Sequence, residues 1–156
     1  IDHFKRVNDT YGHQAGDVVL RHVARTLARL ARQGDLVARY GGEEFLVLLR
    51  SAHPDVAARV ADRFRRGIES LELPASAGVP RVTVSVGVAT WDGPEGSHPE
   101  RAELVETADG ALYEAKRNGR NRVVCNALRR RTSEITREIR VLPSSPAPGR
   151  GPDGAV

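Results

Sequence analysis

The feature that most constrains the fold is the segment RVTVSVGVA, residues 81–89, in which valine occupies every second position from 82 to 88. This period of two predicts a β-strand with one apolar face. Segments with helical spacing of apolar residues come before and after it, so the strand must belong to a sheet that helices cover. A chain of 156 residues is long enough for one such domain with a sizeable core.

The remaining elements follow from apolar spacing and from turn residues. Helices are expected at 15–32, 54–68 and 99–117. Strands are expected at 36–41, 44–50 and 122–125, besides the one at 81–89. Residues 1–14 are expected to form a loop that leaves a strand, and Gly41 and Gly42 to supply the positive φ of a tight hairpin turn. The single cysteine, Cys125, ends the last strand and is expected in the core.

This order of elements predicts an α+β sandwich in which helices pack on a largely antiparallel sheet. Adding one strand before Ile1 gives the order βαββαβ followed by a further helix and strand, so we expect the first strand to be missing from this chain. We expect the domain to span residues 1–125. The basic and then Pro/Gly/Ser-rich composition of residues 126–156 predicts a disordered tail.

The charge of the chain would admit nucleic acid or another phosphate-bearing partner, and the favoured alternative is a basic solvated tail. The net charge is +4, although much of the excess lies in the segment RRRTSEITREIR near the C-terminus. No apolar run is long enough for a transmembrane helix. Only Lys5 and Lys116 are lysines among the 24 basic residues. Because a lysine ammonium meets a phosphate as a compact point charge, both are candidates for phosphate contacts.

Two adjacent carboxylates, Glu43 and Glu44, follow the two glycines of the expected hairpin. Successive strand residues point to opposite faces, so the two side chains need not share a role. One could bind a hard cation such as Mg²⁺, which favours a few carboxylates together with substrate phosphates. The other could accept a proton. The alternative is an ordinary hairpin on which both glutamates face the solvent and bind nothing.

Further polar residues cluster near both ends of the expected domain. Asp2 would lie beside the end of a strand, and the amide of Asn8 with the carboxylate of Asp17 would suit the hydrogen-bonding edge of guanine. The alternative is that such residues form Asx turns and cap the next helix. Lys116 and Arg120 flank an Asn-Gly turn and could hold a polyphosphate, or could simply complement a helix dipole.

In combination these motifs are similar to one known family. DHFKRVNDTYGHQAGD, RYGGEEF, VTVSVGVA and ALYEAKRNGRNRV resemble, in order and spacing, the GGDEF domain of bacterial diguanylate cyclases, over about residues 1–125. The resemblance implies a ferredoxin-like or polymerase-palm-like fold related to nucleotidyl cyclases. It also implies an enzyme that condenses two GTP into cyclic di-GMP and two pyrophosphates, by metal-assisted phosphoryl transfer with Mg²⁺ or Mn²⁺. Two copies of the domain would meet face to face, each holding one GTP.

The resemblance also assigns roles to individual residues. Glu43 and the backbone carbonyl of Ile1 would bind the metal. Glu44 would accept the proton of the attacking hydroxyl, and Lys5 would stabilise the charge of the transition state. The other implied substrate contacts are the backbone amides of His3 and Phe4, the side chains of Asn8, His13 and Asp17, and, for the β- and γ-phosphates, Lys116 and Arg120.

A regulatory site is implied by Arg32 and Asp35. They form an R-x-x-D motif separated by five residues from Gly41, which is the spacing of the family's product-inhibition site. In that site the arginine and the aspartate bind cyclic di-GMP. The motif alone carries no weight in a chain with 22 arginines, but this spacing predicts feedback inhibition by the product.

The chain departs from the family pattern at its first residue. The family has a metal-binding aspartate immediately before the position of Ile1, so we expect this chain by itself to be inactive and the intact protein to be an active cyclase. The domain is expected to face the cytoplasm, with an upstream sensory domain and a membrane tether as possible additions in the intact protein. A non-catalytic module that binds GTP or cyclic di-GMP is the alternative. Nucleic acid is not expected as a partner, because it would explain the charge but none of the motifs.

Overall fold

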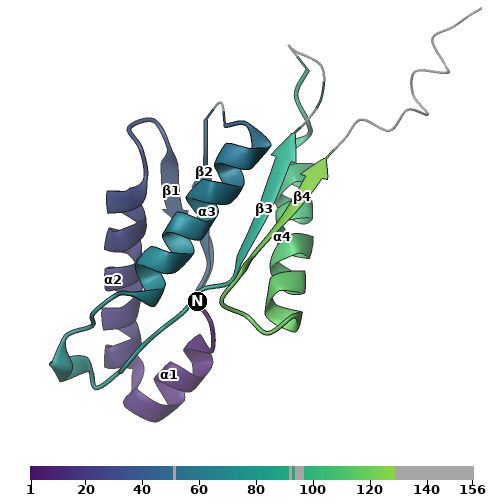
Figure 1. The fold of residues 1–156 in the computed structure, drawn as a ribbon. Helices are drawn as coiled ribbons and strands as arrows, with labels where there is room; N and C mark the ends of the chain where they lie inside the picture. The colour runs from purple at the N-terminus through teal and green to yellow at the C-terminus, as the bar shows by residue number, and fades with distance from the viewer. Residues whose placement is uncertain (51, 92, 94–96, 129–156) are drawn as a thin grey trace, which may run out of the picture.

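The computed structural model describes residues 1–50, 52–91, 93 and 97–128, which form helices and two small sheets (Figure 1). The elements in chain order are α1 (Phe4–Tyr11), α2 (His13–Leu30), β1 (Leu36–Arg39), β2 (Phe45–Leu48), α3 (Pro54–Glu69), the 3₁₀ turn η1 (Ala75–Ala77), β3 (Val86–Trp91), α4 (Arg101–Arg117) and β4 (Val123–Leu128). The helices expected near 15–32, 54–68 and 99–117 are confirmed within two residues at each end.

The described strands form two separate pairs. β1 and β2 are antiparallel, with Leu36 opposite Leu48, whereas β3 and β4 are parallel, with Val86 opposite Val123. A parallel pair needs a crossover connection, and α4 provides it. The expectation of a largely antiparallel sheet is therefore wrong for the described part of the chain. The N-terminus lies between the two pairs (Figure 1), where the amino group of Ile1 donates a hydrogen bond to the carbonyl of Glu43.

The alternating segment at 81–89 is only partly a strand. Val82 and Val84 are buried, as the alternation predicted, but the strand begins at Val86. Residues 81–85 have no ladder partner among the described residues, and the backbone hydrogen bond made there runs from the N–H of Asp2 to the carbonyl of Thr83, at 2.9 Å. The alternation therefore predicted burial correctly, while the hydrogen bonding of a strand depends on a neighbour.

The last strand is longer than expected and more exposed. β4 continues to Leu128, so residues 126–128 belong to a strand and not to the tail, and the rest of the predicted tail, 129–156, lies outside the described residues. Cys125 is exposed, which contradicts its expected place in the core. Three consecutive residues of β4, Cys125, Asn126 and Ala127, are exposed, so the end of this strand is not covered by the core on either face.

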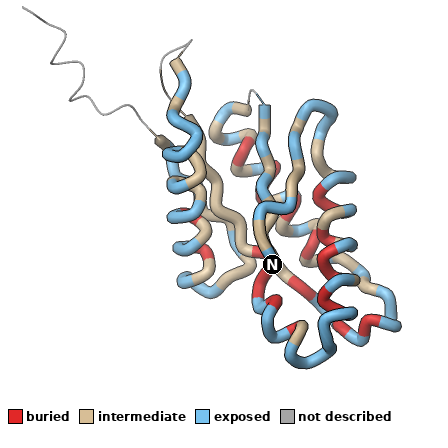
Figure 2. The backbone as a smooth tube through the Cα atoms, turned by 180° about the vertical axis from the view of Figure 1, so that it is seen from behind, coloured by how far each residue is buried: buried red, intermediate tan, exposed pale blue. Residues whose placement is uncertain are grey.

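The best-packed part of the core lies between α2 and α3. Val19, Val23 and Ile68 are almost completely buried there, and Figure 2 shows a row of buried residues along one face of α2. α4 packs through a smaller side chain, the fully buried Ala111 on its inner face. A β-carbon at Gly87 would collide with the backbone of α4, so glycine at this position allows the helix to lie directly on β3.

The N-terminal segment is a helix and not the expected loop. Phe4 and Val7 lie one turn apart on α1, and both are buried against the core. The polar NDTYG sequence that follows them is typical of loops, but burial of this apolar pair stabilises a short helix that would be marginal in isolation. Gly12, at φ 84°, separates α1 from α2.

Candidate functional site

A pocket of about 420 Å³ opens between α1, the first turns of α2 and the β1–β2 hairpin. Its lining residues are Phe4, Lys5, Asn8, His13, Asp17, Leu20, Arg39, Gly42 and Glu43. Six of these nine come from the set of site residues that the sequence predicts. Three separate stretches of the chain therefore bring their predicted side chains to one cavity.

The polar side chains of this pocket are free to bind a ligand. Within the described part of the chain, Lys5, Asn8, His13, Asp17 and Glu43 make no side-chain hydrogen bond and no ion pair. The capping alternative is wrong for α2, because Gly12 precedes its first residue and no side chain caps it. Amide, imidazole, ammonium and carboxylate groups thus remain available in one open cavity.

Gly16 is a positioning residue that the sequence reasoning missed. It lies on α2 directly opposite the side chain of Asn8, and a β-carbon there would collide with Oδ1 of Asn8 and press on the ring of Phe4. The side chain of Asn8 therefore packs against bare helix backbone. A glycine in the first turns of an otherwise regular amphipathic helix is the signal that could have revealed this contact.

The hairpin turn differs in detail from the expected one. Five residues, 40–44, connect the two strands, and neither glycine has a positive φ. Gly41 instead provides space, since a β-carbon there would lie 3.3 Å from Oε2 of Glu44. Arg39, which the sequence reasoning also missed, donates from Nε to the carbonyl of Gly41 at 3.2 Å and from Nη2 to that of Gly42 at 2.7 Å. These bonds fix the shape of the turn that presents Glu43 to the pocket.

A second group of predicted residues does not line the pocket. Lys116, in the last turn of α4, is 3.8 Å from the carboxylate of Glu44, and both side chains remain partly exposed. Arg120 follows one helical turn later, past the end of α4. His3 is exposed and adopts a left-handed conformation just before α1. The structure thus joins the end of α4 to the hairpin through an acid–base pair.

The donor set suits a hard divalent cation only with help from a substrate. The described residues contain no group of three or more His, Cys, Asp or Glu side chains arranged to hold a metal. Glu43 offers one free carboxylate, and Ile1 lies against its backbone. Mg²⁺ is commonly bound by one or two carboxylates together with substrate phosphates. These residues therefore fit a cation that arrives with a phosphorylated ligand.

Asp2 has a different environment from the pocket carboxylates. Only 5% of its surface is exposed, and its carboxylate accepts hydrogen bonds from the hydroxyls of Thr83 and Ser85 and from the backbone N–H of Asn121. Three donors satisfy a carboxylate well and leave little capacity for a metal. Asp2 consequently belongs to the framework around the site.

Arg32 and Asp35 lie together on the turn after α2. The backbone N–H of Arg32 donates to Oδ2 of Asp35 at 3.0 Å, and Gly34 between them has a φ of 100°. A shallow second pocket of about 560 Å³ lies next to the end of α2 and along α3. It contains three arginines, Arg59, Arg63 and Arg66, and Arg63 donates to the carbonyl of Leu30 at 2.8 Å. Asp62 lines the same pocket and pairs with Arg66 at 2.7 Å, so the positive charge offered to an anionic ligand comes mainly from Arg59 and Arg63.

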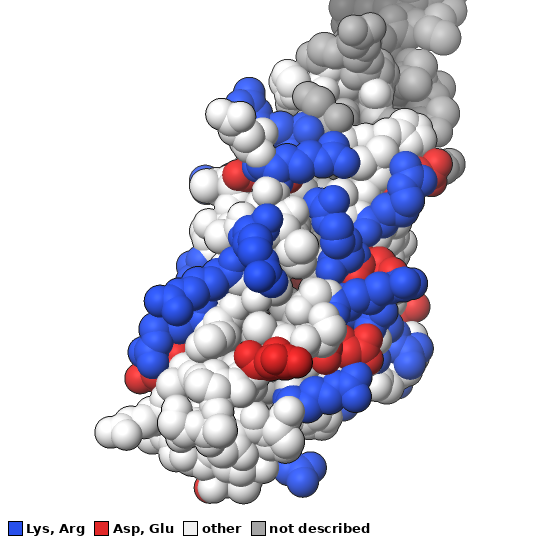
Figure 3. All heavy atoms as spheres, turned by 60° about the vertical axis from the view of Figure 1, so that its left-hand side comes forward, with Lys and Arg blue, Asp and Glu red and all other residues white. Residues whose placement is uncertain are grey.

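The surface on the α2 side is rich in positive charge. Figure 3 shows Lys and Arg side chains spread over this face, with fewer acidic side chains among them. Such a surface attracts anions and raises their local concentration. No helix in the described ranges is long and apolar enough to cross a membrane.

Comparison with known proteins agrees with these observations. The family model described as "Diguanylate cyclase, GGDEF domain" matches residues 1–122. Diguanylate cyclase A of Treponema denticola is 46% identical over 124 residues, which are 79% of this chain and 32% of that protein. The chain thus spans about a third of the length of this curated relative.

Solved structures show the same likeness. The GGDEF domain of DgcB from Caulobacter crescentus, in complex with c-di-GMP, has a TM-score of 0.70 and 40% identity, covering 80% of this chain and 72% of that one. An active GGEEF domain of a diguanylate cyclase from Vibrio cholerae has a TM-score of 0.70 and 32% identity, covering 80% and 77%. The expected mixed fold of helices and sheets, related to the polymerase palm and to nucleotidyl cyclases, is therefore confirmed.

Proposed function

The chain belongs to the diguanylate cyclase GGDEF domain family, and we propose that it binds one GTP in the pocket between α1, α2 and the hairpin and condenses it with the GTP of a second copy. The products are cyclic di-GMP and two pyrophosphates. The observation that carries this proposal is the pocket itself, in which five polar side chains from three segments face the cavity without partners among the described residues. We take residues 1–128, which include the whole of β4, as the catalytic domain.

The free side chains suit the parts of a guanine nucleotide. Asn8 and Asp17 supply an amide and a carboxylate for the edge of guanine, whose N1–H and amino group need an acceptor. His13 lies between them along the chain and lines the same cavity. Lys5 adds a positive charge near the start of α1, where the backbone amides of His3 and Phe4 can approach the phosphates.

The chemistry belongs to the hairpin and to the end of α4. Glu44 accepts the proton of the attacking 3′-hydroxyl as the new O–P bond forms at the α-phosphate and pyrophosphate leaves. Lys5 stabilises the charge that develops in this step. Lys116 and Arg120 hold the β- and γ-phosphates, and the 3.8 Å separation of Lys116 from Glu44 supports a site that extends from the hairpin to α4.

A divalent cation, Mg²⁺ or Mn²⁺, is the cofactor that suits these oxygen ligands. Glu43 and the carbonyl of Ile1 would hold it together with the phosphates of GTP. When bound, such a cation neutralises phosphate charge and favours displacement at phosphorus.

Two copies of the domain are needed for turnover. Each pocket has room for one nucleotide, whereas the product joins two, so the hydroxyl of one bound GTP must meet the α-phosphate of the other across an interface. A sensory domain elsewhere in the natural protein would control this meeting. Feedback inhibition would act through Arg32 and Asp35, and the arginines of the second pocket support binding of the anionic product beside that turn.

The proposal is tested by incubating the natural protein with GTP and Mg²⁺ and measuring cyclic di-GMP and pyrophosphate by chromatography and mass spectrometry. We expect one cyclic di-GMP for every two pyrophosphates, and loss of product inhibition in the Arg32→Ala variant. Binding of GTP without product would indicate the alternative, a regulatory module that binds the nucleotide only. Absence of both binding and product would contradict the proposal.

A further inference from the structure

The turn after α4 has an unusual backbone. Three consecutive residues, Gly119, Arg120 and Asn121, have positive φ values of 106°, 61° and 47°. Glycine adopts this left-handed region freely and asparagine tolerates it, but for an arginine it is unfavourable. Residues in such conformations persist where the surrounding structure fixes them, and they concentrate at functional sites. The contacts that hold this turn in its left-handed conformation therefore indicate its function.

The backbone of the turn is bound by Asp2. The N–H of Asn121 donates to Oδ2 of Asp2 at 3.1 Å. The same buried carboxylate accepts from the hydroxyl of Thr83 at 2.7 Å and from that of Ser85 at 2.6 Å. Asp2 thus connects the start of the chain, the segment before β3 and the turn after α4.

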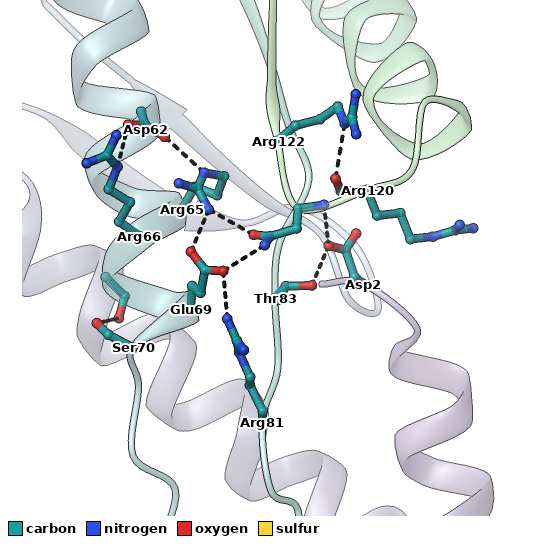
Figure 4. A network of polar contacts seen from close by, with 12 residues as sticks. Asp2, Asp62, Arg65, Arg66, Glu69, Ser70, Arg81, Thr83, Arg120 and Arg122 are labelled. Atoms are coloured by element: carbon teal, nitrogen blue, oxygen red, sulfur yellow. Dashed lines mark hydrogen bonds and ion pairs between the residues drawn. The ribbon is translucent and has the colours of Figure 1, made fainter.

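The side chain of Asn121 is bound on its other side by α3. Its Nδ2 donates to Oε1 of Glu69 at 2.9 Å, and its Oδ1 accepts from Nη1 of Arg65 at 3.0 Å. Glu69 also accepts from Arg65 at 2.7 Å and from Arg81 at 2.6 Å (Figure 4). Both polar ends of the amide are therefore used, one as donor and one as acceptor. We call Asp2, Asn121, Glu69 and Arg65 the Asp2–Asn121 clamp.

Arg120 itself takes no part in these side-chain contacts. Its backbone N–H donates to the carbonyl of Ala115 at 3.0 Å, and Figure 4 shows its side chain pointing away from the network. Lys116, one turn earlier, lies next to Glu44 of the hairpin. Asp2 directly follows Ile1, which binds the hairpin at Glu43. The clamp therefore joins the turn that carries Arg120 to the segment that borders the pocket.

We propose that Asp2 and Asn121 are positioning residues, which hold the left-handed turn so that Arg120 faces the polyphosphate of the bound nucleotide. This inference rests on the proposed binding of GTP. Neither residue lines the pocket, and both act through Arg120. If the clamp is opened, Arg120 can return to an ordinary backbone conformation, and the site loses a phosphate contact while its guanine contacts remain.

The test compares two nucleotides in the natural protein. α,β-Methylene GTP carries the β- and γ-phosphates and is not cleaved at the reacting bond, whereas GMP lacks these phosphates. By titration calorimetry, we expect Asn121→Ala to weaken binding of the GTP analogue about tenfold and to leave the affinity for GMP within about twofold. In an Arg120→Ala background, Asn121→Ala should cause less than about a twofold further loss, because the contact that it positions is already absent.

A reciprocal exchange provides the matched control. The pair Asn121→Asp with Glu69→Gln places an acceptor at 121 and a donor at 69, so the hydrogen bond between them can form in the reverse direction. The contact from Arg81 to the same oxygen of Glu69 is lost in this exchange, because an amide N–H cannot accept from Arg81. We expect this double variant to regain most of the affinity for the GTP analogue. Asn121→Asp alone should lose that affinity, because the new carboxylate and that of Glu69 repel each other. Asp2→Asn keeps the shape of the side chain. Like Asn121→Ala, it should weaken binding of the GTP analogue more than binding of GMP.

The outcomes separate this inference from the proposed function. Equal losses for the analogue and GMP, unchanged binding in Asn121→Ala, or full additivity with Arg120→Ala would overturn the positioning role while leaving GTP binding intact. If the unaltered protein binds neither nucleotide, the proposed function fails and the inference fails with it.

Discussion

The pocket and the Asp2–Asn121 clamp lie close together but treat their polar groups in opposite ways. In the pocket, the side-chain carboxylates of Asp17 and Glu43 accept no hydrogen bond from the described residues. In the clamp, the carboxylate of Asp2 accepts three hydrogen bonds and that of Glu69 accepts bonds from Arg65, Arg81 and Asn121. Carboxylates of the same chemical type are therefore open to a ligand in one region and saturated in the other.

This difference separates binding from positioning. An unpaired polar side chain at an open surface costs little, because water solvates it until a ligand arrives. A buried carboxylate such as Asp2 is tolerated only when donors surround it. Substitutions in the pocket should consequently change function with little effect on folding, whereas substitutions in the clamp should change both.

The largest expected effect is on turnover. In the natural protein, Glu44→Gln should reduce formation of cyclic di-GMP about 1,000-fold, since it removes the proposed proton acceptor. The loss of its partly exposed ion pair with Lys116 should change stability by less than about 1 kcal/mol. Steady-state product formation and hydrogen exchange measure the two effects. A variant that retained more than a tenth of the activity would contradict the role of Glu44.

The comparison between the regions is sharpest for two aspartates. Asp2→Ala should lower the free energy of unfolding of the domain by about 3 kcal/mol, because two hydroxyls and one backbone N–H lose a charged acceptor in a buried place. Asp17→Ala is the matched control in the pocket and should change the free energy of unfolding by less than about 0.5 kcal/mol. Hydrogen exchange followed by mass spectrometry measures both. Equal effects of the two substitutions would remove the distinction between the regions.

Two helical glycines test how the pocket is shaped. Gly16→Ala should displace the side chain of Asn8 and weaken GTP binding about tenfold, because overpacking of this kind costs about 1–3 kcal/mol. Gly110 of α4 has open space around it, so Gly110→Ala should leave binding unchanged and stabilise its helix by about 0.5–1 kcal/mol. Calorimetric titration distinguishes the two. Normal binding by Gly16→Ala would show that the position of Asn8 is not critical.

The smallest expected effect is a change in the stability contributed by Glu69 at acidic pH. Hydrogen bonds from Asn121 and then from Arg65 lower the pKa of Glu69 from its usual value of 4.5. Because the folded-state pKa is depressed, the stability that Glu69 contributes is present above pH 4.5 and is lost as the pH falls through the lower folded value. The stability difference between the unaltered protein and Glu69→Gln should therefore be nearly constant at neutral pH and shrink as the pH falls below about 4.5. A difference independent of pH would argue against ionised Glu69 as the partner of Asn121.

Local patterns predicted much of the fold. The apolar spacing of α2, α3 and α4 depends only on neighbours one helical turn away, and these helices were placed within two residues at each end. The helix α1 was missed because its stability comes from packing of Phe4 and Val7 against distant residues, while its own sequence is typical of a loop. The strand at 81–85 was overestimated for the same reason, since a ladder requires a partner that alternation does not reveal.

The sequence by itself determined the family, the chemistry of the candidate residues and the burial of the alternating valines, because motif order and side-chain periodicity are properties of the chain alone. Only the tertiary structure decided which acidic groups are free and which are bound. It separated Asp2 from Glu43, revealed the support that Gly16 and Arg39 give to the pocket, and brought Asn121 to a carboxylate 119 residues earlier in the chain. These contacts join residues that are distant in the sequence, and no local pattern specifies which distant groups will meet.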